Sequence, residues 1–158
     1  LDVRRRIAAL RVPGANPAGA ALRPASHGRS TNPWWLPAGQ EIHVFDTARW
    51  VRLATHMLPG PVLQLQATDD ALWALVGPRA GATLFTLGDS QADAWQRVGA
   101  GAGALAALRA APRGPQVLAL RAADAHELLL LEAGGAGLRR WSVPAGVALD
   151  GLAWWPAG

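Results

Sequence analysis

The side chains best suited to acid–base chemistry or metal binding in this sequence are four histidines, and they are widely separated. They are His27, His43, His56 and His126. No pair has the His-Glu-x-x-His spacing, or the spacing of two residues along a strand, that would bring two metal ligands together. A zinc site would have to be assembled from distant loops. The chain has no cysteine, so disulfides and thiolate chemistry are excluded.

Other catalytic signatures are equally incomplete. Ser26 and Ser90 have no matching base and acid at a recognisable spacing, and the glycine-rich stretch 99–103 is not followed by the Lys-Ser/Thr pair of a phosphate-binding loop. The acidic residues of 69–70 and 88–93 lack the regular carboxylate spacing and closing glutamate of a calcium loop. The sequence therefore predicts no catalytic residues, no metal and no cofactor, and it favours a protein that is not an enzyme.

A repeat organises the elements that must position these residues. Trp50, Trp95 and Trp141 are spaced by 45 and 46 residues. The apolar run 71–76 has a counterpart at 117–120, and the run 83–87 has a counterpart at 128–131. A period of about 40–50 residues made of short apolar runs is typical of β-propeller blades.

The repeat predicts an all-β chain of about three and a half propeller blades, each a four-stranded antiparallel meander. Residues 1–19 would form a basic N-terminal segment with an outer strand at Arg5–Leu10. The blades would span 20–54, 62–98 and 104–143, with a partial blade over 147–158. The predicted strands are 21–23, 34–36, 41–46, 50–53, 62–66, 71–76, 83–87, 95–98, 104–108, 116–121, 127–132 and 139–143.

Two alanine- and leucine-rich stretches favour a different structure. Intrinsic propensity predicts helices over 103–111 and 122–133. The repeat predicts strands there, and we give it more weight because tertiary context overrides propensity.

The sequence around these runs also resembles a known group. The residues Trp-x-Arg-Leu/Val at 50–53 and 95–98, Leu-Gln-Leu-Gln-Ala-Thr-Asp-Asp-Ala-Leu-Trp-Ala-Leu-Val-Gly at 63–77, and Thr-Leu-Phe-Thr-Leu at 83–87 are similar to blades of tectonin-type and related bacterial β-propellers. The resemblance covers about residues 41–143, and the repeat is longer than typical tectonin repeats. It implies a ring of four-stranded blades that holds ligands or partners on its loop faces. Three and a half blades need a second copy, another chain or further residues to complete a ring.

The tryptophans fall into two groups. A tryptophan at one position of each repeat is typical of packing between sheets, so Trp50, Trp95 and Trp141 are predicted to lie in the core. Neighbouring strand residues point to opposite faces, so one member of each pair at 34–35 and 154–155 is predicted to be exposed or at an interface. Trp34 and Trp155 are the candidates for contact with a partner or ligand.

Propeller geometry would bring one set of polar residues to a shared loop face. That face would gather His56, Arg79, Asp124 and His126, with Gln40 nearby. Such a cluster is suited to a small anionic or sugar ligand, and the alternative is a set of solvated loops. The opposite face would gather His27, Arg29, Asp69, Asp70 and Arg113.

Positive charge is concentrated at the start of the sequence. Residues 1–30 carry six arginines and one acid, whereas 31–158 carry nine arginines and ten acids. The run Arg4, Arg5, Arg6 could contact an anionic surface, or it could be a solvated edge. A near-neutral body disfavours nucleic-acid binding, and no apolar run reaches the roughly 18 residues of a membrane helix.

These observations predict a non-catalytic interaction or scaffold module that binds a protein partner through loop faces or blade edges, or completes its ring by self-association. The alternative is a carbohydrate-binding or glycoside-hydrolase-like propeller whose exposed tryptophans stack on sugars. A third interpretation is a piece of a longer gene. The absence of lysine and tyrosine, with abundant arginine and alanine, indicates GC-rich codon usage and a bacterial source, in the cytoplasm or periplasm.

Overall fold

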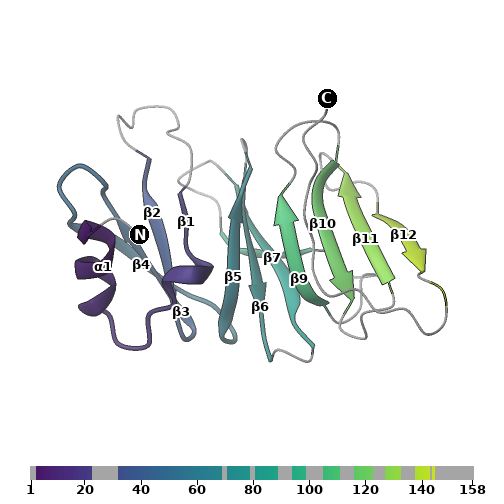
Figure 1. Cartoon of the computed structure of the whole chain (residues 1–158), viewed down its shortest axis with the longest axis horizontal. Helices are drawn as coiled ribbons and strands as arrows, with labels where there is room; N and C mark the ends of the chain where they lie inside the picture. The colour runs from purple at the N-terminus through teal and green to yellow at the C-terminus, as the bar shows by residue number, and fades with distance from the viewer. Residues whose placement is uncertain are drawn as a thin grey trace.

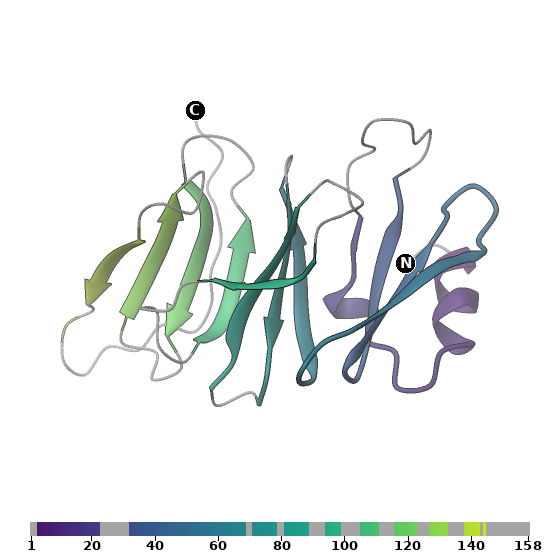
Figure 2. The ribbon, with the colours of Figure 1, turned by 180° about the vertical axis from the view of Figure 1, so that it is seen from behind.

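Strands dominate the computed structural model of the chain. The structure describes residues 3–22, 32–68, 71–78, 81–88, 94–98, 105–110, 116–122, 127–132, 138–142 and 144. Within these ranges a short helix precedes three four-stranded antiparallel sheets that lie in a row (Figure 1). The prediction of an all-β chain built from four-stranded antiparallel meanders is confirmed, and the described strands do not close a ring (Figure 2).

Each sheet takes four consecutive strands in chain order. The chain enters through helix α1 (Val3–Leu10) and the 3₁₀ turn η1 (Pro17–Gly19). Sheet A contains β1 (Ala21–Leu22), β2 (Trp34–Ala38), β3 (Glu41–Phe45) and β4 (Arg52–Met57). Sheet B contains β5 (Val62–Ala67), β6 (Ala71–Val76), β7 (Thr83–Gly88) and β8 (Gln96–Val98). Sheet C contains β9 (Leu105–Ala110), β10 (Gln116–Ala122), β11 (Glu127–Glu132) and β12 (Leu138–Ser142).

The first strands of sheets B and C each pack against the preceding sheet. β5 lies against β1 and β2, and β9 lies against β5 and β6 (Figure 1). Backbone hydrogen bonds join the sheets at both junctions. Between sheets A and B, the Val62 amide donates to the Gly39 carbonyl at 2.8 Å. Between sheets B and C, Leu105 and Ala82 exchange two hydrogen bonds of 2.8 and 3.0 Å. The side chain of Gln64 adds a bond of 3.0 Å to the Leu108 carbonyl. These bonds fix the row of sheets at its inner strands.

The described parts of the alanine- and leucine-rich stretches form strands, as the repeat predicted. They supply β9 and β11, which flank β10 in sheet C. These two strands bury three leucines against sheet B: Leu105, Leu108 and Leu129. Burial of these leucines outweighs their helix propensity, because the helix propensities of ordinary residue types differ from one another by less than about 1 kcal/mol per residue.

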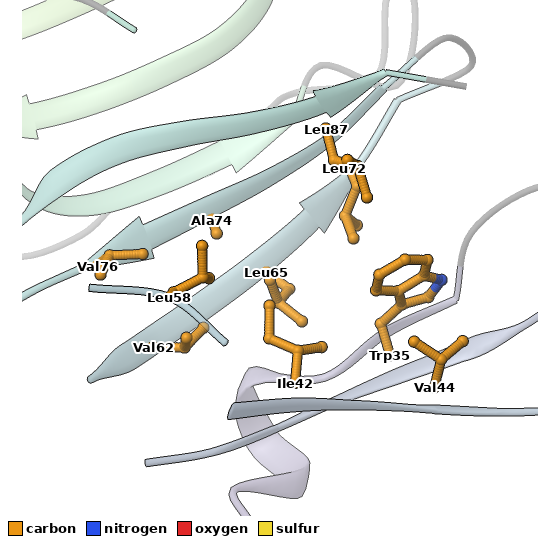
Figure 3. Packing of buried hydrophobic residues seen from close by; sticks show 10 residues of the cluster. All are labelled: Trp35, Ile42, Val44, Leu58, Val62, Leu65, Leu72, Ala74, Val76 and Leu87. Carbon is orange, nitrogen blue, oxygen red and sulfur yellow. The ribbon is translucent and has the colours of Figure 1, made fainter. Parts of the chain in front are cut away.

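Three apolar layers hold the row together. One lies between α1 and sheet A, the second between sheets A and B, and the third between sheets B and C. In the second layer Trp35 and Ile42 of sheet A point toward Leu65 and Leu72 of sheet B (Figure 3). The central strands β2 and β3 of sheet A are thus covered on both faces, which explains why every residue of β2 is buried.

Burial on both faces corrects the prediction for the first tryptophan pair. Trp34 and Trp35 do point to opposite sides of β2, but their exposed fractions are 2% and 4%. Trp34 packs in the layer beneath α1, and Trp35 packs against sheet B. Of the two predicted alternatives, exposure or a place at an interface, exposure is wrong for this pair because a helix, absent from the predicted fold, covers the first face.

The N-terminal segment is that helix, and not the outer strand predicted at Arg5–Leu10. Its inner side is formed by Ala8 and Ala9, and Val12 beyond its end packs in the same cluster. Alanine, arginine and leucine are all strong helix formers. The segment lies on the face of sheet A, so no strand ladder competes with its helical hydrogen bonds (Figures 1 and 2).

The repeated tryptophans are less buried than predicted. Trp50 and Trp95 are half-buried and pack at the margins of two clusters, whereas Trp141 is 45% exposed. Trp50 and Trp95 precede the fourth strands of their sheets, but Trp141 lies within β12, opposite Leu128 at the beginning of β11. The equal spacing therefore does not correspond to equal positions in the third sheet.

The backbone at Trp50 adopts a conformation that its residue type disfavours. Its φ is 56°, in the left-handed region. The Trp50 amide donates to the Asp46 carbonyl at 2.8 Å, and the indole meets the Trp34 ring edge-on at 5.9 Å between centroids. Packing on Trp34 thus compensates for a backbone cost of about 1–2 kcal/mol. The turn also delays β4, which begins at Arg52 and not at Trp50 as predicted.

We expect Trp50→Gly to be more stable than Trp50→Ala by about 1 kcal/mol, because both lose the indole but only glycine removes the left-handed strain. Urea unfolding of the two variants measures the difference. Leu53 in β4 is the control, since glycine at an ordinary strand position is less stable than alanine. The interpretation fails if alanine is the better residue at both positions.

Candidate functional site

His56, one of the predicted ligand residues, lies in β4 at the boundary between sheets A and B. Its ring centroid is 5.0 Å from that of Trp35 and 6.3 Å from that of Trp95, the latter in an edge-on arrangement. The Trp95 indole N–H donates to His56 Nδ1 at 3.2 Å. The three rings bridge the sheets, and the accepting nitrogen is already used. His56 therefore contributes first to inter-sheet packing.

Most of the predicted cluster lies outside the described residues. Arg79, Asp124, His126 and Trp155 lie outside the described residues, as do His27, Arg29, Asp69, Asp70 and Arg113 of the opposite face. Gln40 is described, in the turn between β2 and β3, where its carbonyl accepts the Leu58 amide at 2.9 Å. Trp34 is buried beneath α1 and cannot contact a ligand, which corrects its assignment.

A polar set that sequence reasoning missed crosses β3 and β4. His43 is buried, and its Nε2 lies 2.9 Å from Oε2 of Glu41. On the other side its Nδ1 lies 3.5 Å from Nη1 of Arg52. The Glu-x-His spacing on one strand was the available signal, because alternate residues share a face.

The geometry assigns the proton positions in this set. An imidazole with its proton on Nε2 donates to the carboxylate, and its Nδ1 accepts from the guanidinium. Both ring nitrogens of His43 are then engaged, so the ring has no free lone pair for a metal or a substrate proton. Chemically the set is a cross-strand connection that holds β4 on β3.

Asp46 closes the turn that follows β3. Its Oδ1 accepts the amides of Ala48 and Arg49 at 2.7 and 2.9 Å, and Arg49 Nη2 lies 3.7 Å from Oδ2. These two hydrogen bonds lower the pKa of the Asp46 carboxyl below its usual value, and the bond from the Arg49 amide has the larger effect. The turn thus favours the ionised carboxylate.

Acidification should therefore destabilise this turn. A lowered folded-state pKa means that the contribution is present above the unfolded-state pKa of about 3.9 and is lost as pH falls through the folded-state value. We expect Asp46→Asn to keep the acceptor oxygen and to show a smaller loss of thermal stability between about pH 5 and pH 2. Asp46→Ala should lower the melting temperature at pH 7. Equal acid sensitivity of the wild type and Asp46→Asn would contradict this role.

β4 differs from the outer strands of the other sheets. It is six residues long and almost wholly exposed, and it carries the apolar side chains of Val51, Leu53 and Met57 in or beside it, with exposed fractions of 46%, 50% and 64%. β8 has only three residues, and β12 presents exposed Arg139 and Arg140. Short length and charge are two ways in which proteins protect a strand edge. β4 has neither protection along most of its length.

The described ranges hold no group of three or more histidine, aspartate or glutamate residues placed to bind a metal ion. In the same part of the chain, no helix has the length and apolar character needed to cross a membrane.

The arrangement thus consists of an inter-sheet aromatic bridge at His56, a self-satisfied polar set at His43 and an open apolar edge at β4. No protein-family model matches the sequence, and no curated protein matches it either.

Proposed function

We propose that this chain is a non-catalytic, propeller-type interaction module that binds an extended segment of a protein partner along β4. Support for the propeller type comes from three successive four-stranded meanders whose first strands adjoin one another. Support for a binding role comes from the hydrogen bonds of the two described histidines. Both ring nitrogens of His43, and Nδ1 of His56, bond to neighbouring side chains of the chain itself.

The exposed edge of β4 is the observation that carries the proposal. An added strand supplies main-chain hydrogen bonds to such an edge, and alternate side chains supply specificity. On the β4 side, Leu53 and Met57 offer exposed apolar contact area, and Arg52 is the only charged residue of the strand. The bonds from His43 to Glu41 and Arg52 hold the receiving strand in place.

A partner segment can be sought without knowing the partner. Peptides of eight to ten residues displayed on phage would be selected on the immobilised chain, synthesised and titrated into labelled protein. We expect selected peptides to alternate apolar and polar residues and to shift the amide NMR signals of 52–57. Leu53→Lys should weaken their binding at least tenfold, because a charge would lie beside the apolar side chains of the added strand.

The matched control is Leu22→Lys, which places the same charge on an exposed leucine of the inner strand β1. It should leave peptide affinity unchanged. The proposal is wrong if selected peptides perturb another surface, or if Leu53→Lys and Leu22→Lys bind equally well. A dimer that Leu53→Lys dissociates would instead identify β4 as a contact between two copies, and sedimentation velocity distinguishes this outcome.

A further inference from the structure

Helix α1 presents a second apolar surface, opposite to the side that packs on sheet A. Val3, Ile7 and Leu10 are 67%, 47% and 86% exposed. Their spacing of four and then three residues places them in one stripe along the helix. Ala8 and Ala9, on the other side, are buried against sheet A. The helix is thus fixed by one side and apolar on the other.

Positive charge surrounds this stripe. Arg4, Arg6 and Arg11 are exposed beside it, and Arg5 is half-buried. The stretch 3–22 contains no acidic residue at all. Within the described residues 3–22, the charged side chains beside the stripe are all arginines, and such a stripe is complementary to a surface that is both anionic and apolar beneath its charges.

An open groove continues the stripe past the end of the helix. It has a volume of about 550 Å³ and is lined mostly by apolar residues, with one cation at its border. The residues that connect it to the stripe are Arg6 and Leu10, and Pro13 and Pro17 extend it. The groove offers space for an apolar chain whose anionic end would lie near Arg6.

We propose that the outer side of α1 and this groove dock on an anionic lipid bilayer. A short convex stripe of aliphatic residues fits a deformable interface, where arginine side chains keep their charge at the headgroups while their stems lie on apolar surface. The helix lies at one end of the row of sheets, so a flat surface can approach it (Figures 1 and 2).

Co-sedimentation of the full chain with lipid vesicles tests this proposal. We expect binding to vesicles of phosphatidylcholine with 30% phosphatidylserine, weak binding to pure phosphatidylcholine, and release in about 0.5 M salt. Arg4→Gln/Arg6→Gln should weaken partitioning more than tenfold, since each arginine near such a surface contributes about fivefold. Leu10→Gln should weaken it several-fold without removing charge.

The matched control is Arg97→Gln/Arg139→Gln, which removes the same charge from exposed positions of sheets B and C. It should retain vesicle binding. Equal loss in both arginine pairs, or equal binding to neutral and anionic vesicles, would overturn the proposal. Absence of vesicle binding would also overturn it and would leave an acidic protein groove as the occupant. Leu53→Lys should bind vesicles normally, so this test is independent of the role proposed for β4.

Discussion

Replacing Trp35 by alanine should lower the free energy of unfolding by about 3–5 kcal/mol. Trp35 is almost completely buried between sheets A and B, where it packs with Ile42, Val44 and Leu65 (Figure 3). Its removal opens a cavity of indole size in the layer that joins the two sheets. It also removes the ring on which His56 packs at 5.0 Å, and His56 is the acceptor for Trp95.

Trp141→Ala is the matched control for this substitution. It deletes the same side chain from a position that is 45% exposed in β12. We expect a loss of at most about 1 kcal/mol, as for exposed substitutions away from packed sites. Urea unfolding followed by circular dichroism measures both variants. Similar losses at the two positions would show that the layer between sheets A and B does not carry the stability that its burial implies.

The strand pattern was readable from the sequence because two local signals agreed. The apolar runs at 71–76 and 128–131 are flanked in the sequence by glycine and aspartate residues, and β6 and β11 have the predicted bounds. Strand pairing within each sheet then followed from short connections, which favour antiparallel neighbours. Turn geometry limited the accuracy at β4, where the left-handed Trp50 displaces the strand by two residues.

Contacts between layers were not readable in the same way. Ala8 and Ala9 resemble any alanines of this alanine-rich chain until sheet A is seen beneath them. The repeat predicted a strand there because it treats every segment as part of a sheet. The burial of Trp34 and the exposure of Trp141 likewise depend on what covers each face of a sheet, which period-two alternation does not encode.

The candidate site shows the same division. The predicted cluster relied on loops from different repeats, and of its members only His56 and the nearby Gln40 are described. The set of Glu41, His43 and Arg52 depends on the register of β3 against β4 and on a bulge that brings Arg52 opposite Phe45. A one-residue change in register would place Arg52 on the other face. Sequence spacing alone could therefore pair Glu41 with His43 but could not add Arg52.

The second large effect is expected where α1 covers sheet A. Ala9→Glu should lower the free energy of unfolding by about 2–4 kcal/mol at neutral pH, because the larger, charged side chain would replace a buried methyl group among apolar side chains and lose its hydration. The helix avoids this cost if it leaves the sheet. Trp34, Leu36 and Phe45 would then be exposed to water, and such a patch promotes association. A red shift of tryptophan fluorescence and a concentration-dependent increase in mass measure these outcomes.

Leu10→Glu provides the matched control, since it introduces the same charge one residue further along α1 at a side chain that is 86% exposed. We expect its stability to stay within about 0.5 kcal/mol of the wild type. If Ala9→Glu is also tolerated and leaves the fluorescence unchanged, α1 is not required to cover sheet A, and that face would be free to receive another sheet. If only Ala9→Glu associates, the helix is what prevents sheet A from packing against a further sheet, and growth of the row from its N-terminal side is excluded while α1 is docked.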